Sequence, residues 1–165
     1  MTYASSSSLG ALSALLRSQR GVTARLAQVV SERGLPPEAL PEPLIQLRSA
    51  AAELEDRATG NKYPQLSLYV DRVENLLTEK FRRFSGRVDL AVEIRVSQDR
   101  IADLEQQTQA YVDSVTAVLE DCRGEWAEGV YYSGKYEIKF GAVKRGGRNF
   151  LQTTIITAPV EVSRG

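Results

Sequence analysis

The sequence contains no histidine and a single cysteine among its 165 residues. Histidine is the commonest zinc ligand and the side chain that most often acts as an acid or base near neutral pH, so its absence excludes Ser-His, Cys-His and His-metal sites. Cys122 has no second cysteine to pair with, which excludes a domain held together by intrachain disulfides. Its place among the apolar residues of a predicted helix favours buried packing over a reactive thiol.

Net charge and long apolar runs are also lacking. The 21 lysines and arginines balance the 21 aspartates and glutamates, so no overall field draws the chain toward DNA or an anionic membrane. No apolar run approaches the roughly 18 residues of a membrane span, and the first residues lack the basic-then-apolar order of a signal peptide. We therefore expect a soluble chain that has no membrane partner and folds inside the cell around a single core.

An amphipathic helix is predicted over residues 9–30, where leucines and valines recur three or four positions apart. The serines at positions 5–8 are the expected N-cap, and Gly34 is the expected C-cap. Gly21 lies within this helix and costs about 1 kcal/mol relative to alanine, which marks a point where the helix bends or breaks.

A proline-rich connector separates this helix from the sheet. The four prolines over residues 36–43 remove backbone donors, which excludes a regular helix or a central strand there. A short helix is predicted over residues 43–58, with a partly ordered excursion as the alternative. The apolar period then changes to two over residues 65–70, and most clearly over residues 86–96, so both stretches are predicted strands.

The rest of the chain is predicted to contain one more long helix and several strands. Ser97 is expected to cap the helix, which ends near Arg123. A bent strand pair is expected over residues 130–140, followed by a turn at residues 144–149 and a long strand over residues 150–162.

This order of elements predicts an α+β fold, a mostly antiparallel β-sheet with two long helices packed on one face. Residues 1–62 form an N-terminal helix, a connector and a short helix, and residues 63–165 form the sheet and the second long helix, within one domain overall. The predicted core comprises the apolar faces of the clearest strand and of the second long helix: Val88, Leu90, Val92, Ile94, Val96, Leu104, Val112, Val115 and Leu119.

The turn at residues 144–149 is the main candidate for an interaction site. Lys144, Arg145 and Arg148 place three cations within five residues, beside Asn149. Its glycines resemble a phosphate-binding loop, but in such a loop a helix begins directly after Gly-Lys-Ser/Thr, whereas a strand follows here. Nucleotide binding is therefore not expected, and a solvated hairpin turn and a contact loop remain as interpretations.

Charge is segregated along the sequence. Residues 98–122 carry six carboxylates and one cation, a net charge of −5, and residues 123–149 carry six cations and three carboxylates, a net charge of +3. Arg82 and Arg83 add a second small cationic patch. Opposed patches of this kind attract neighbouring copies head to tail, as in a ring, and two ordinary solvated surfaces are the alternative.

Other groups that could carry chemistry have simpler interpretations. Neighbouring carboxylates on a helix diverge, so the acidic clusters are typical of a solvated face. Carboxylates rather than cations interleave the aromatic group of Trp126, Tyr131, Tyr132 and Tyr136, which favours core or interface packing over base stacking. We predict no catalytic residue, no metal ligand and no cofactor.

Five short runs in the last hundred residues carry a resemblance to a known family. They are Phe81-Arg-Arg-Phe-Ser-Gly86, Val92-Glu-Ile-Arg-Val-Ser97, Tyr111-Val-Asp-Ser-Val-Thr-Ala-Val-Leu119, Gly129-Val-Tyr-Tyr-Ser-Gly134 and Lys144-Arg-Gly-Gly-Arg-Asn-Phe150. In these runs and in the order of its elements, the chain resembles the tail terminator, or tail completion, proteins of tailed bacteriophages over residues 63–162.

The resemblance implies a structural virion protein and no enzyme. Tail terminators form a ring, usually a hexamer, that caps the finished tail tube, stops its growth and presents a surface to the head-side connector or stopper protein. The implied partners are further copies of the chain, the tail tube protein and the connector, while genome DNA passes through the lumen without specific binding. The implied location is the neck region of the virion tail, and the host cytoplasm during assembly.

Two other classes of function remain open. One is a small nucleic-acid-binding module that uses the basic turn with Arg82 and Arg83 as a second patch; such a module gathers its cations on one face and depends steeply on salt. The other is an enzyme that works through carboxylates alone. The candidate interaction residues are Lys144, Arg145, Arg148, Asn149, Arg82 and Arg83.

Overall fold

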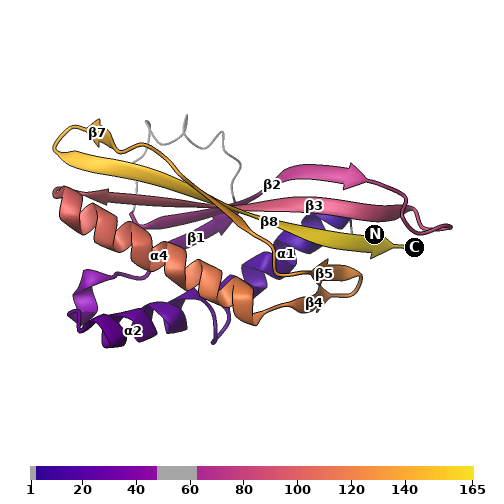
Figure 1. Cartoon of the computed structure of the whole chain (residues 1–165), viewed down its shortest axis with the longest axis horizontal. Coiled ribbons are helices and arrows are strands. Elements are labelled where there is room, and N and C mark those ends of the chain that lie inside the picture. Colours follow the sequence, from indigo (N-terminus) through magenta and orange to yellow (C-terminus); the bar gives the residue numbers. More distant parts are fainter. Residues whose placement is uncertain (1–2, 48–62) are drawn as a thin grey trace.

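The computed structural model describes residues 3–47 and 63–165, whose eight β-strands join one sheet with the helices on one of its faces (Figure 1). This confirms the predicted α+β fold. In chain order the elements are α1 (Ala4–Arg17), α2 (Val22–Arg33), the 3-10 helix η1 (Pro37–Ala39), β1 (Leu44–Leu47), β2 (Gln65–Asn75), β3 (Phe84–Gln98), α4 (Ile101–Asp121), β4 (Gly124–Ala127), β5 (Val130–Tyr132), β6 (Glu137–Phe140), β7 (Lys144–Gly146) and β8 (Asn149–Arg164).

The two longest strands, β3 and β8, form the centre of the sheet. They pair antiparallel over their whole length, from Phe84 opposite Arg164 to Gln98 opposite Phe150. On the far side of β3 lies antiparallel β2, and β1 pairs with β2 in parallel at the edge. The predicted, mostly antiparallel sheet is thus confirmed.

One apolar core lies between the sheet and the helices. Helices α1 and α4 contact the strands directly, and α2 lies against α4. Each of the nine predicted core residues is exposed by 2% or less, including Leu90 on β3 and Leu119 on α4. Two apolar faces of different period, one from a strand and one from a helix, therefore meet as the sequence predicts.

The predicted first helix is two helices with a break between Arg17 and Val22. Gly34 ends α2 in the left-handed conformation, with φ of 62°, as expected of a C-cap. The expected N-caps are wrong. Tyr3 precedes α1, so the serines lie inside the helix, and Ser97 lies in β3, so that Arg100 precedes α4.

The predicted short helix over residues 43–58 is wrong at its start, and residues 48–58 lie outside the described residues. Residues Leu44–Leu47 form β1, in register with the first four residues of β2. Arg17 also donates a hydrogen bond of 2.9 Å to the carbonyl oxygen of Ile45. Long-range pairing, which the helical spacing of a few leucines does not reveal, decides the conformation here.

The two strands predicted over residues 130–140 are both present, but their predicted pairing with each other is wrong. Strands β5 and β6 do not pair with each other, since each pairs antiparallel with β8. Together with β7 they follow one edge of β8 end to end, and β5 pairs on its other side with β4, which the sequence pattern did not predict. The 16 residues of β8 supply enough edge for all three short strands.

Replacing Gly21 by alanine is expected to destabilise the chain by about 1–3 kcal/mol. Gly21 precedes α2, and a Cβ there would lie 2.3 Å from the carbonyl oxygen of Leu16. Within an uninterrupted helix the same substitution would stabilise the chain by about 1 kcal/mol. The sign of the change in stability therefore distinguishes one continuous helix from two helices with a break at Gly21. Thermal unfolding measures it, and Gly10→Ala in α1, where nothing lies within 4 Å of the added Cβ, is the control.

The face of β3 that points away from the core also holds buried charged residues. Glu93 and Arg95 are each 4% exposed, and Arg95 Nη2 lies 3.3 Å from Glu93 Oε1. Asp89 is 6% exposed and accepts a 2.5 Å hydrogen bond from Arg87 Nε. Residues two apart share a face of a strand, so the charged residues at alternate positions of β3 form ion pairs along the strand.

Candidate functional site

The candidate basic turn is a hairpin between β7 and β8, which we call the basic hairpin (residues 144–149). Gly146 pairs with Asn149, so Gly147 and Arg148 form a two-residue loop. Gly147 has φ of 66°, the positive value that a type II′ turn needs at this position. The hairpin lies at one end of the sheet, where Figure 1 labels β7.

The cations of the basic hairpin face solvent. Lys144, Arg145 and Arg148 are exposed, and none of them forms an ion pair with a carboxylate among the residues that the structure describes. Arg145 lies over the ring of Phe150 at 5.8 Å from its centroid, a cation–π contact that directs this side chain along the hairpin. The hairpin is therefore an ordered turn that presents unpaired positive charge.

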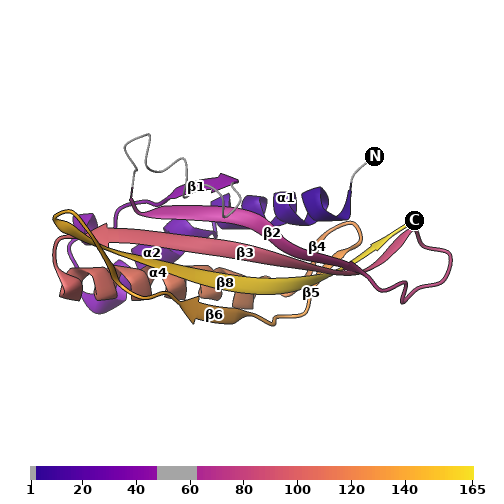
Figure 2. The ribbon, with the colours of Figure 1, turned by 90° about the horizontal axis from the view of Figure 1, so that it is seen from above.

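The second predicted patch, Arg82 and Arg83, lies in the β2–β3 loop (residues 76–83). Figure 2 shows this loop projecting past the C-terminal end of β8, where Arg83 N donates to the carbonyl oxygen of Arg164. The basic hairpin lies at the opposite end of β8, about 50 Å away at roughly 3.3 Å per residue. The structure therefore does not bring the two predicted patches together.

Sequence reasoning missed two unusual residues of the β2–β3 loop. Leu77 and Phe81 have φ of 49° and 67°, values that residues with bulky side chains rarely adopt, and the Phe81 side chain is fully exposed. Hydrogen bonds fix the base of the loop, among them the 3.1 Å bond from Asn75 Nδ2 to the carbonyl oxygen of Arg83. The loop thus holds an aromatic side chain out in solvent on an ordered backbone.

The aromatic group divides into a buried part and an exposed part. Tyr132 is fully buried, its ring centroid lies 4.9 Å from that of Trp126, and burial raises its pKa to about 12. The predicted core packing is confirmed for this pair. Tyr131, in contrast, is 52% exposed on the face of the sheet that points away from the helices.

The acidic segment over residues 98–122 is partly neutralised within the chain. Arg33 Nη2 of α2 lies 2.6 Å from Asp113 on α4, and Arg25 of α2 pairs with Asp121. A third carboxylate, Glu120, accepts a 2.6 Å hydrogen bond from the hydroxyl of Tyr136, whose pKa this bond raises. The segment is therefore not the bare −5 surface that its composition indicates.

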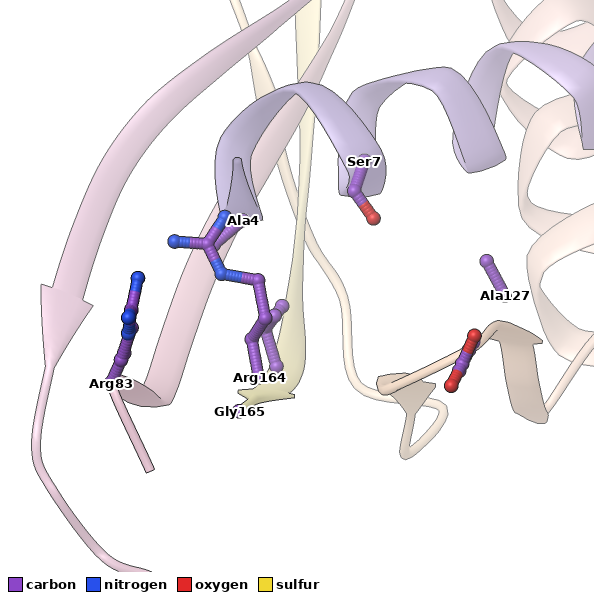
Figure 3. Close-up of a pocket in the computed structure, with 8 residues that line it drawn as sticks. Ala4, Ser7, Arg83, Ala127, Arg164 and Gly165 are labelled. Atoms are coloured by element: carbon purple, nitrogen blue, oxygen red, sulfur yellow. The ribbon is translucent and has the colours of Figure 1, made fainter. Parts of the chain in front are cut away.

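Two cavities lie at the end of the sheet opposite the basic hairpin. The smaller, of about 310 Å³, lies between the start of α1 and the ends of β4 and β8; Figure 3 shows Arg83 and Arg164 on one side of it and Ala127 on the other. The larger, of about 650 Å³, lies between the β2–β3 loop and the exposed face of the sheet, and Tyr131 lines it.

Candidate metal ligands and the single thiol were located among the residues that the structure describes. No three carboxylates or thiols gather there in a way that could hold a metal ion. Cys122 is half-buried against the core. No helix among the described residues has the length and apolar character needed to cross a membrane.

Comparison with known proteins gives no family assignment. No family model matches the chain, and no curated protein matches it. Among solved structures, the chain is similar to one from the virion of a native gene transfer agent particle, with a TM-score of 0.48 and 11% identity, covering 98% of this chain and 99% of the other. At that level the similarity supports no assignment of function.

Proposed function

We propose that this chain is a structural virion protein without enzymatic activity. It is a tail terminator that forms a ring of six copies on the end of a phage tail tube. The ring ends tube polymerisation and provides the joint to the head-side connector. Its location is the neck of the virion tail, after assembly in the host cytoplasm. The proposal starts from the sequence resemblance over residues 63–162 and from an α+β fold that is compatible with it.

The observation that carries the proposal is the placement of two exposed contact elements at opposite ends of one sheet. The basic hairpin presents unpaired cations at one end, and the β2–β3 loop presents a fully exposed Phe81 at the other. A ring subunit between a tube and a connector needs such separate surfaces, since it meets neighbouring copies and two further partners. Leu76 and Leu77 of the same loop are also more than half exposed, and a group of exposed apolar side chains marks a protein contact more than a single one does.

The separation of the cations also bears on the nucleic-acid alternative. A module that follows a phosphate backbone gathers its cations along one face, whereas here the two predicted patches lie about 50 Å apart along β8. We propose accordingly that DNA passes through the ring without specific binding and that the basic hairpin contacts protein.

Replacing Lys144, Arg145 and Arg148 together by serine is expected to leave folding intact and to reduce head-tail joining at least about tenfold. Each exposed charge pair contributes only about 0–1 kcal/mol, but copies repeated around a ring add, and about 1.4 kcal/mol already corresponds to a tenfold change. The measurement is the titre of infectious or gene-transferring particles when the variant replaces the wild-type chain, with circular dichroism as the folding check.

The matched control replaces Arg20, Lys135 and Lys139, three exposed cations elsewhere, by serine. A normal particle titre for the hairpin variant would reject the hairpin as a contact, and a saturable nucleic-acid affinity lost in that variant would favour the nucleic-acid module. Image averaging of assembled tails tests the ring itself: a single copy at the tail end, in place of a symmetric ring, contradicts the proposed function.

A further inference from the structure

The larger cavity is built on one row of side chains across the sheet. Strand register places Arg87 of β3 opposite Glu161 of β8, Glu161 opposite Tyr131 of β5, and Tyr131 opposite Glu125 of β4. These four side chains share the face that points away from the helices. The β2–β3 loop, with Leu76 among its residues, forms a further wall of the cavity.

The row presents more negative than positive charge. Arg87 is paired with Asp89, whose hydrogen bond and charge raise the pKa of the arginine. Glu125 and Glu161 are exposed, and neither forms an ion pair within the part of the chain that the structure describes. The exposed ring of Tyr131 lies between these two carboxylates.

This arrangement fits a long cationic side chain. A guanidinium or ammonium group pairs with a carboxylate and is attracted to the face of a tyrosine ring. The aliphatic part of such a side chain packs on apolar surface, here supplied by Leu76, which is 52% exposed. The volume of about 650 Å³ lies within the range of small-molecule sites, so the cavity has room for a long cationic side chain.

We infer that the larger cavity receives the basic hairpin of a second copy of this chain. The inference rests on the proposed function, to which it adds the two surfaces that meet. The hairpin supplies three unpaired cations and the cavity two unpaired carboxylates beside an aromatic ring. The contact cannot form within one chain, because Arg148 and Glu161 are 13 residues apart along the extended strand β8, roughly 40 Å.

The contact is heterologous, since each copy offers its hairpin to one neighbour and its cavity to the other. Heterologous contacts produce a closed ring when the rotation between copies closes. The cavity thus supplies the negatively charged surface that attracts the cations of a neighbouring copy. Composition alone indicated residues 98–122 for this role, but their carboxylates are partly paired with α2.

Disulfide capture between copies tests this inference. The variant carries Arg148→Cys and Glu161→Cys on a Cys122→Ser background, and the full-length chain is oxidised at high concentration and low salt. The matched control carries Arg148→Cys with Asp71→Cys, which also removes one cation and one carboxylate but places the second thiol at an exposed position of β2. Gel electrophoresis without reductant measures the covalent multimers.

We expect the Arg148/Glu161 variant to form a ladder of multimers at least about tenfold faster than the control, and high salt to slow it toward the control rate. Equal rates for the two variants, or no multimers from the first, overturn the inference. Such a result leaves the proposed function standing if tails still show a ring, whereas a single copy on assembled tails contradicts the proposed function independently.

Discussion

Replacing Arg95 by methionine is expected to lower the free energy of unfolding by about 3–5 kcal/mol. Arg95 and Glu93 lie two residues apart on β3, each 4% exposed, with 3.3 Å between Nη2 and Oε1. Methionine fills a similar volume but leaves the buried carboxylate of Glu93 without its partner. Removing one member of a buried pair costs far more than the pair itself contributes, because the remaining charge stays desolvated.

The exposed pair of Arg72 and Glu74 on β2 is the matched control. It has the same spacing and the same 3.3 Å distance, but its side chains are 63% and 40% exposed. Arg72→Met is therefore expected to cost no more than about 1 kcal/mol in chemical denaturation. The double variant Glu93→Leu/Arg95→Met should recover part of the stability lost by Arg95→Met. Equal effects of Arg95→Met and Arg72→Met would show that burial does not govern the β3 pair.

The pairing within β3 shows which part of a strand the sequence reveals. Alternation over residues 86–96 predicts the strand and the residues that face the core, and all of these are buried. The same alternation says nothing about the burial of the other face, where Asp89, Glu93 and Arg95 are also largely shielded from solvent. Burial of that face depends on the surrounding tertiary structure, which local periodicity does not encode.

Predictions from local sequence patterns were wrong where residues distant in the sequence determine the conformation. Gly21 marked the break between α1 and α2 correctly, because a glycine weakens a helix wherever it lies. Leu44 and Leu47 carry a helical spacing, yet they lie in a strand because β2 offers them a parallel edge. Strands β5 and β6 likewise pair with β8, which lies further along the sequence, and not with each other.

The candidate contact surfaces divide in the same way. The basic hairpin was predictable because its cations and glycines are contiguous in the sequence. The cavity was not, since Arg87, Tyr131 and Glu161 meet only through the register of three strands. Phe81 lies within one of the runs that carry the resemblance. Apart from the cations beside it, the neighbouring sequence does not indicate that its side chain is exposed or that its φ is positive.

Leu90→Ala and Leu119→Ala are each expected to destabilise the chain by about 2–5 kcal/mol. Both side chains are fully buried in one core, Leu90 from the sheet and Leu119 from α4. Truncation removes buried apolar surface and leaves a cavity that surrounding side chains fill only partly, because both elements are held by long-range packing. The loss should appear as a lower midpoint in urea denaturation with an unchanged slope.

The control is Leu47→Ala, at a leucine that is 54% exposed on the edge strand β1, where a change within about 0.5 kcal/mol is expected. Combining Leu90→Ala with Leu119→Ala also tests whether the sheet and the helix layer depend on each other. If sheet and helix share one core, the double variant Leu90→Ala/Leu119→Ala should unfold in one transition, since neither layer keeps its apolar face covered without the other. Two separate transitions, or single variants as stable as Leu47→Ala, would show that α4 does not pack on β3 as described.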